Sequence, residues 1–233
     1  MYIRLIGDVH GLTNELRSIV NDTPKEIEAI LQLGDMGVGF GQSDYWHDSL
    51  DTYMQDNNVY FFRGNHDSPA RAKTFANNVN PGIWNSCFVI PGAWSIDNPQ
   101  APPGWYRRTE GVDWWPEEEL SDAEFAMLFE MYADLKPSIV FSHDCPTSVA
   151  KQMFFDTGFI RGPQYTTRTA YALQRMHEVH QPNVYIFGHY HKTMLHIQHK
   201  TYFMCLNELD YINIDLENID YTQQVMLDKI SAY

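Results

Sequence analysis

The sequence contains little of what marks several common classes of protein. Its three cysteines, Cys87, Cys145 and Cys205, are widely spaced and form no Cys-x-x-Cys pair, which argues against a disulfide framework and a thiolate zinc site. We therefore expect buried, unreactive thiols. The first apolar run, Tyr2–Ile6, is too short for a secretory segment or a membrane span, so we expect a cytoplasmic protein that does not enter the membrane.

Basic residues are also scarce. The sequence has 16 Lys and Arg against 30 Asp and Glu, which gives a formal charge of −14. This balance argues against broad binding to a nucleic-acid backbone or to an anionic membrane. It leaves a small anionic substrate open, since divalent ions would make one cleft locally positive. With 44% hydrophobic residues in 233, we expect one globular domain, residues 1–233.

Short apolar segments rich in β-formers alternate with helical patterns, which indicates an α/β fold without repeats. We expect strands at the following residues: Tyr2–Ile6, Ala29–Leu33, Val59–Phe62, Cys87–Ile90, Ile139–Phe141, Val184–Phe187, His196–Gln198, Tyr202–Leu206 and Ile212–Leu216. The last three lie close together in the sequence and suggest an antiparallel meander. Helices are expected around Leu12–Val20 and at Asp44–Gln55, Ser121–Leu135 and Thr167–Val179.

Residues 95–116 combine prolines, tryptophans and arginines without periodicity, and we expect an irregular loop insertion there. Arg107 and Arg108 beside Trp105 have the chemistry to contact a phosphate and a nucleobase. The favoured interpretation is nevertheless a loop that its tryptophans pack over the core. The acidic run Glu117–Glu119 indicates a solvated helix start.

Five polar motifs follow the ends of five expected strands, where α/β sheets usually carry their sites. They are Gly7-Asp8-Val9-His10-Gly11, Gly34-Asp35-Met36-Gly37, Gly64-Asn65-His66-Asp67, Ser142-His143-Asp144 and Gly188-His189-Tyr190-His191. An Asp and a His two residues apart in a turn can both point at one metal ion. Mixed oxygen and imidazole ligands favour manganese, iron, zinc, cobalt or nickel over calcium or an all-magnesium site.

The complete series, in this order, resembles the calcineurin-like metallophosphoesterases. The resemblance spans Gly7 to His191, and the segment from Val89 to Asp97 is similar to small bacterial and phage members. It implies a four-layer α/β/β/α sandwich of two mixed sheets flanked by helices.

The resemblance also implies two divalent transition-metal ions, with manganese favoured. One ion would be held by Asp8, His10, Asp35 and His191 and the other by Asp35, Asn65, His143 and His189, so that Asp35 bridges the pair. His66 would be the catalytic residue that protonates the leaving oxygen or stabilises its developing charge. The remaining histidines are expected to be structural: His47, His177, His180, His196 and His199.

Arg63 precedes the third motif, at a place where the protein phosphatase branch also has an arginine, and is a candidate substrate-binding residue. The same branch carries Asp-Arg-Gly after its second motif, whereas this chain continues Gly37-Val38-Gly39. The departure weakens an assignment as a protein serine/threonine phosphatase and removes one expected phosphate ligand.

We therefore expect a metal-dependent phosphoesterase in which a metal-bridging hydroxide attacks a phosphorylated substrate. A phosphomonoester, such as a phosphoprotein or nucleotide, is the favoured substrate. A phosphodiesterase acting on cyclic or oligomeric nucleotides is the alternative, and a non-catalytic interaction scaffold on the same fold is an alternative of another class. The sequence does not specify the oligomeric state.

Overall fold

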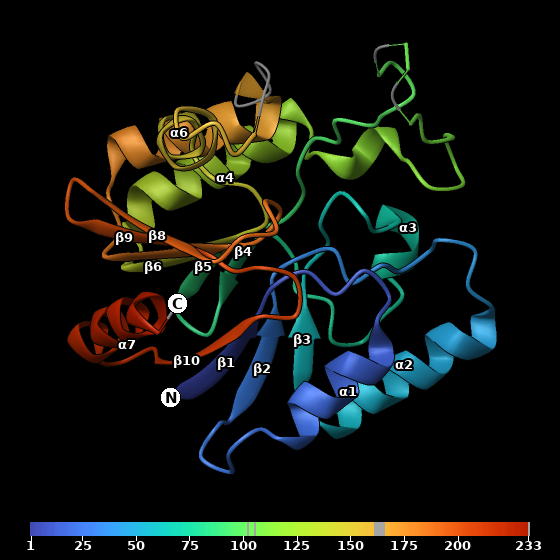
Figure 1. The fold of residues 1–233 in the computed structure, drawn as a ribbon, viewed down its shortest axis with the longest axis horizontal. Helices are drawn as coiled ribbons and strands as arrows, with labels where there is room; N and C mark the ends of the chain where they lie inside the picture. The colour runs from blue at the N-terminus through green and yellow to red at the C-terminus, as the bar shows by residue number, and fades with distance from the viewer. Residues whose placement is uncertain (102, 105, 161–165, 233) are drawn as a thin grey trace.

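Two mixed β-sheets form the centre of the computed structural model, which describes residues 1–101, 103–104, 106–160 and 166–232 (Figure 1). In this part of the chain the smaller sheet has the strand order β10-β1-β2-β3, and the larger one has the order β4-β5-β6-β7-β9-β8. The smaller sheet consists of β1 (Tyr2–Ile6), β2 (Ala29–Gln32), β3 (Val59–Phe61) and β10 (Tyr211–Asp215). The larger sheet consists of β4 (Gly82–Trp84), β5 (Cys87–Ile90), β6 (Ile139–Ser142), β7 (Val184–Phe187), β8 (Met194–Gln198) and β9 (Thr201–Cys205).

Alternation along the strands divides the core into three apolar layers. In β7, Val184 and Ile186 point between the sheets, whereas Tyr185 and Phe187 point to the outer face. That outer face is covered by α4 (Asp122–Leu135), α5 (Thr147–Ala150) and α6 (Arg168–Val179). The outer face of the smaller sheet is covered by α1 (Thr13–Asn21), α2 (Asp44–Asp56) and α3 (Pro69–Ala72). The expected four-layer α/β/β/α sandwich is confirmed.

Helix ends follow the capping residues of the sequence. Ser121 accepts from the backbone N–H of Glu124, whose side chain accepts from the backbone N–H of Ser121, and this capping box starts α4. Thr167 caps α6 with a single hydrogen bond, because its side chain accepts from the backbone N–H of Ala170. The helices expected at Asp44–Gln55, Ser121–Leu135 and Thr167–Val179 are therefore confirmed to within a residue or so at each end.

The expected antiparallel meander at the end of the chain is wrong in part. Strands β8 and β9 do pair antiparallel, but β9 is parallel to β7, and β10 pairs antiparallel with β1 in the other sheet. Alternation fixes which faces of a strand are buried, but it does not specify which neighbour its backbone pairs with.

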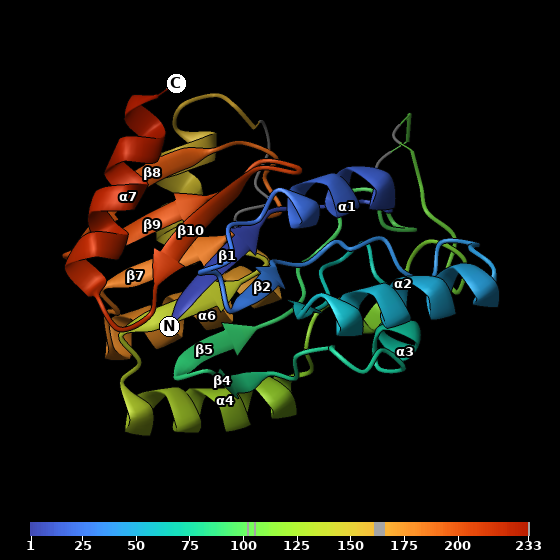
Figure 2. The ribbon, with the colours of Figure 1, turned by 90° about the horizontal axis from the view of Figure 1, so that it is seen from below.

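Helix α7 (Ile219–Ser231) and strand β4 were not expected from the sequence. Asn218 caps α7 by accepting from the N–H of Tyr221, and Met226 is fully buried in the layer between the sheets. Helix α7 therefore packs beside β10 and β8 at the edge shared by both sheets, rather than in an outer layer (Figure 2). The Asn218 cap and the apolar residues that follow it were the available signal for this helix.

The fold collects the five motifs at one edge. Strands β1, β2 and β3 are mutually parallel in one sheet, and β6 and β7 are parallel in the other. Each is followed directly by one motif, so the loops at their carboxyl ends face one another where the two sheets meet. In the described residues, no helix combines the length and apolar character needed to cross a membrane.

Candidate metal centre

Four side chains from the first, second and fifth motifs converge on one point. One potential ligand atom from each of Asp8, His10, Asp35 and His191 lies within 4.8 Å of all the others. The Asp8 Oδ2 atom is 3.0 Å from His191 Nε2 and 3.6 Å from His10 Nε2. These are the four residues that the family resemblance assigned to a single ion.

The carboxylate of Asp8 provides a test of whether this group fits a metal. Asp8 is fully buried, and its Oδ1 accepts from the backbone N–H of His189 at 3.0 Å. Its Oδ2 has no hydrogen-bond partner of good geometry among the described residues, although two imidazole nitrogens lie near it. A buried carboxylate oxygen without a partner is costly. A cation among these donors would satisfy it, and a set of carboxylates and imidazoles suits a transition metal.

A second group of donors lies on the other side of Asp35. His143 Nε2 is 3.2 Å from Asp35 Oδ1 and 3.0 Å from Asn65 Oδ1. The ring of His189 lies beside that of His143, with centroids 5.1 Å apart. Asp35 thus lies between the two groups, and its Oδ2 faces His10 at 3.8 Å.

Neighbouring hydrogen bonds orient the donors of this second group. The Nδ1 of His143 donates to the carbonyl oxygen of Leu33 at 2.8 Å, which leaves Nε2 directed into the centre. The amide nitrogen of Asn65 donates to Ser95 Oγ at 3.0 Å, so the amide oxygen turns toward His143. Ser95 Oγ in turn donates to the carboxylate of Glu118.

The expectation of a solvated helix start at Glu117–Glu119 is therefore wrong for Glu118. Only 2% of Glu118 is exposed, and its carboxylate also accepts from the backbone N–H of Ser95 at 2.9 Å. Burial raises the pKa of Glu118 to about 7, against the opposing effect of its hydrogen bonds with Ser95. A run of three acidic residues gives no sign of which one turns inward.

The backbone of the centre is strained at four of its donors. His10, Asp35, His189 and His191 have φ of 48°, 60°, 70° and 47°, in the left-handed region that costs a residue with a side chain energy. Such strain persists only where surrounding contacts hold it.

Two glycines show how closely the loops meet. A Cβ atom on Gly188 would collide with Asp8 Oδ1, and one on Gly34, which has a φ of 95°, would collide with the ring of His143. Both positions therefore require glycine for space, and Gly34 requires it for conformation as well.

Asp67 joins the second and third motif loops. It is fully buried, and its carboxylate accepts from the backbone N–H groups of Gly37 at 2.7 Å, Gly64 at 2.8 Å, Val38 at 3.0 Å and Met36 at 3.2 Å. No role for Asp67 was expected from the sequence. Its place in the Gly-Asn-His-Asp motif was the available signal.

His66 lies beside the two donor groups rather than within them. Its backbone N–H donates to Asp35 Oδ1 at 2.6 Å, and its ring stacks on Phe40 at a centroid distance of 5.9 Å. Its Nε2 is 4.0 Å from Asp35 Oδ2. Burial, reinforced by the nearby Arg108, outweighs the charge of Asp35 and lowers the pKa of His66 to about 3. The imidazole is therefore neutral at pH 7.

Arg108 reaches this site from the loop after β5. Only 5% of it is exposed, its Nε donates to Asp97 Oδ1 at 2.9 Å, and its Nη2 contacts the ring of His66. The favoured interpretation, a loop that its tryptophans pack over the core, did not include this contact between Arg108 and His66. Trp105 lies outside the described residues, and Arg107 is exposed.

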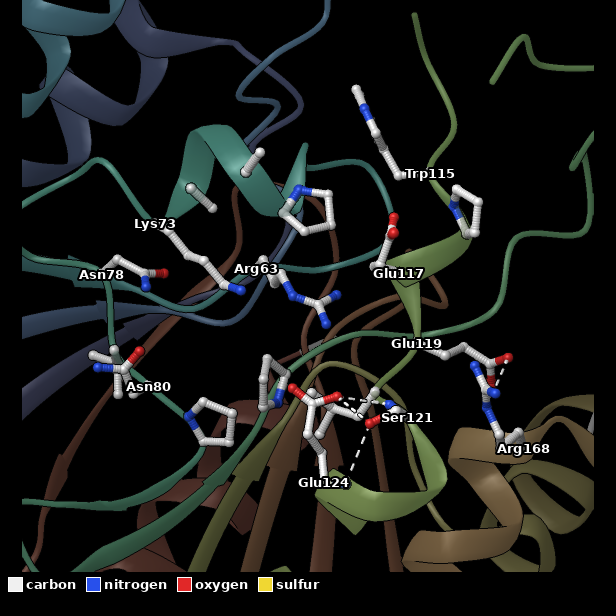
Figure 3. Close-up of a pocket in the computed structure, with 18 residues that line it drawn as sticks. Arg63, Lys73, Asn78, Asn80, Trp115, Glu117, Glu119, Ser121, Glu124 and Arg168 are labelled. Atoms are coloured by element: carbon white, nitrogen blue, oxygen red, sulfur yellow. Dashed lines mark hydrogen bonds and ion pairs between the residues drawn. The ribbon is translucent and has the colours of Figure 1, made fainter. Parts of the chain in front are cut away.

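Arg63 is not brought to the two donor groups. Its Nη1 donates to the carbonyl oxygen of Glu118 at 2.5 Å, and its guanidinium lines a separate cavity of about 580 Å³ (Figure 3). Lys73 and Glu117 line the same cavity. A contact between Arg63 and a phosphate at the centre is therefore not supported by this arrangement.

The other expectations concern residues away from the centre. His47 and His177 are buried and belong to neither donor group. The cysteines are free and buried, as the sequence indicated.

Residues 1–193 match the family model of the calcineurin-like phosphoesterases. The chain belongs to this family. Membership supports metal-dependent hydrolysis of a phosphate ester and agrees with the metal-binding group described above. The match ends just after the fifth motif, so β8, β9, β10 and α7 lie beyond it.

Solved structures show the same fold at low sequence identity. A dimetal phosphatase from Danio rerio is 14% identical, with 91% of each chain covered and a TM-score of 0.57. The phosphopantetheinyl hydrolase from Mycobacterium tuberculosis is also 14% identical, with 88% of this chain and 89% of that one covered and a TM-score of 0.50. No curated protein gives a significant match to the sequence.

The interactions of Asp67 predict how this phosphoesterase responds to Asp67→Asn. The amide keeps the size of the side chain but replaces one acceptor oxygen with a donor, which leaves backbone N–H groups of the motif loops without a partner. We expect the affinity for Mn²⁺ to fall about 10- to 100-fold, measured by calorimetric titration. Asp44→Asn, at an exposed carboxylate, is the matched control. Equal affinities in the two variants would contradict the role of Asp67.

The acid–base properties of His10 and His143 give a second prediction. Burial lowers the pKa of both, but the nearby carboxylates of Asp8 and Asp35 outweigh it and raise the pKa of His10 to about 9 and that of His143 to about 10. Protons on these rings therefore stabilise the fold below about pH 6.5, and this stabilisation is lost as the pH rises toward 9 to 10. Metal ions compete with the same protons.

We expect the melting temperature of chelator-treated protein to fall between pH 6.5 and 9. Added Mn²⁺ should raise the melting temperature more at pH 9 than at pH 6.5, because fewer protons then have to be displaced. Differential scanning calorimetry with and without Mn²⁺ measures both effects. A melting temperature that rises with pH in the chelated protein would show that these histidines are not protonated as described.

Proposed function

We propose that the protein hydrolyses phosphate esters at a dinuclear centre, with a phosphomonoester as the favoured substrate and manganese as the favoured metal. One ion would be bound by Asp8, His10, Asp35 and His191, and the other by Asp35, Asn65, His143 and His189. The observation that carries this proposal is the position of Asp35, with Oδ2 at 3.8 Å from His10 and Oδ1 at 3.2 Å from His143.

Bound divalent ions would supply an activated water and positive charge for the phosphoryl group. The protein's own residues hold the donors rigidly, since Asp67 fixes two of the loops. Asp144 fixes the fifth motif by accepting from the Tyr190 hydroxyl at 2.8 Å, while the Tyr190 ring stacks on Phe154. Preorganised donors need no rearrangement as charge develops in the transition state.

His66 would act on the leaving oxygen. Of its two expected roles, the lowered pKa supports the second, because a neutral imidazole donates a hydrogen bond to developing negative charge without being a strong acid. Arg108 beside the ring keeps its position fixed.

Hydrolysis of para-nitrophenyl phosphate and of bis(para-nitrophenyl) phosphate tests the proposal. With Mn²⁺ we expect turnover of the monoester to exceed that of the diester and to stop when a chelator is added. His66→Ala should lower kcat about 10²- to 10³-fold with metal content unchanged, whereas His199→Ala, at an exposed histidine, should change neither. Loss of metal from His66→Ala would contradict the role of His66, and preferred hydrolysis of the diester would favour a phosphodiesterase.

Asp35→Asn tests whether the carboxylate is shared. We expect it to weaken the binding of both ions, while His10→Ala weakens one and His143→Ala weakens the other. Elemental analysis after equilibrium dialysis at a series of Mn²⁺ concentrations measures each occupancy. If Asp35→Asn lowers only one occupancy, the carboxylate does not bridge the ions.

A further inference from the structure

A cavity of about 270 Å³ opens directly beside the proposed metal ligands. Its polar lining includes Asp35, Asn65, His66 and the two histidines of the fifth motif, together with Asp144, Thr167 and Tyr190. The apolar side of its lining consists of Trp94, Ile96, Phe155 and Ile160. Arg108 and its partner Asp97 line the same cavity.

Arg108 is held firmly in this position. Its backbone N–H donates to the carbonyl oxygen of Asp97 at 2.9 Å, and its Nε donates to the Asp97 carboxylate, also at 2.9 Å. Its Nη1 is 3.4 Å from both the carbonyl oxygen of Asn65 and Ser95 Oγ, and its Nη2 contacts the ring of His66. A guanidinium has five N–H donors in a planar fork, two of them on each Nη atom. Because the Nη1 contacts are long and Nη2 has a second N–H, both Nη atoms can still donate into the cavity.

Arg108 is already paired with Asp97, and an anion between its guanidinium and the proposed metal ions would further reduce the repulsion among these cations. Two phosphoryl oxygens match the fork of a guanidinium, which binds them with two parallel hydrogen bonds. Arg108 supplies a guanidinium to the same centre from a distant segment.

The size and the apolar side of the cavity restrict what else can enter. A volume of about 270 Å³ lies just below the range of roughly 300–1,000 Å³ that is usual for ligand pockets. A single organic group fits such a space better than the two of a diester. Aromatic and aliphatic walls favour a group of the same character, because its burial there removes apolar surface from water.

We propose that Arg108 binds the phosphoryl oxygens of the substrate and that the side formed by Trp94, Ile96, Phe155 and Ile160 receives an aromatic or apolar organic group. The substrate class is then a small aryl or alkyl phosphomonoester. This inference rests on the proposed function, which it narrows to one class of ester.

Binding of inorganic phosphate to the Mn²⁺-loaded protein tests the role of Arg108 without any turnover. We expect Arg108→Gln to weaken phosphate binding about 10- to 100-fold by isothermal titration calorimetry. Arg108→Lys keeps the charge but loses the fork, and it should give an intermediate affinity. Arg107→Gln removes the same charge from an exposed neighbour and should leave the affinity within about twofold of the unaltered protein.

Metal content and melting temperature are measured for each variant, and Arg108→Lys decides the result if Arg108→Gln does not fold. Phosphate binding by both Arg108 variants equal to that of Arg107→Gln would overturn the assignment of Arg108.

Trp94→Ala tests the apolar side. We expect it to raise KM for para-nitrophenyl phosphate about 10-fold but to leave KM for glycerol 2-phosphate and the affinity for inorganic phosphate nearly unchanged. Tyr106→Ala, at an exposed aromatic of the same loop, is the control. Equal changes in KM for both esters would overturn the apolar assignment. A protein that binds phosphate through Arg108 but hydrolyses neither ester would instead contradict the proposed function.

Discussion

The other residues of the centre are positioned through their contacts with Asp35. It is almost fully buried, and Oδ1 alone accepts from the backbone N–H of His66 at 2.6 Å and lies 3.2 Å from His143. The backbone carbonyl of Asp35 accepts from Val9 and His10 at 2.9 and 2.8 Å. One residue therefore links the loops that follow β1, β2, β3 and β6. Removing such a charge from water is favourable only where positive or hydrogen-bonding partners surround it, and the family's metal ions are partners of this kind.

This arrangement also explains why the centre tolerates an unfavourable backbone. Left-handed conformations at Asp35 and at three histidine donors cost energy in isolation. The packed sheets and buried groups such as Asp67 offset that cost, because Asp67 accepts from backbone N–H groups that would otherwise be buried without a partner. Such rigidity suits a site whose metal ligands must be correctly oriented before the substrate binds.

The candidate metal centre and the loop beside it contribute different residues to the site. Residues that follow the strands form the candidate metal centre, whereas the long connection from β5 to α4 carries Ser95, Arg108 and Glu118. Ser95 and Glu118 orient Asn65, and Arg108 faces the cavity. Loops of this kind vary without disturbing the sheets. The same fold and the same reaction class are thus compatible with different organic groups on the substrate.

The five motifs and their order carried the resemblance to the calcineurin-like family, and that resemblance implied the reaction class, the α/β/β/α layers and the set of candidate ligands. The motifs were recognisable because each follows a strand whose own pattern is clear. Helix ends at Ser121 and Thr167 were also predictable, since a cap acts on its immediate neighbours. The helix caps and the strand patterns depend on short-range interactions that a sequence displays directly.

The tertiary structure alone decided that β10 joins β1, that Glu118 is buried, and that Arg108 rather than Arg63 lies beside His66. The physical reason is common to these cases. Two features depend on which surfaces come into contact after folding: the pairing of distant strands and the direction of a long side chain on an irregular loop. A local pattern of residues does not specify these contacts.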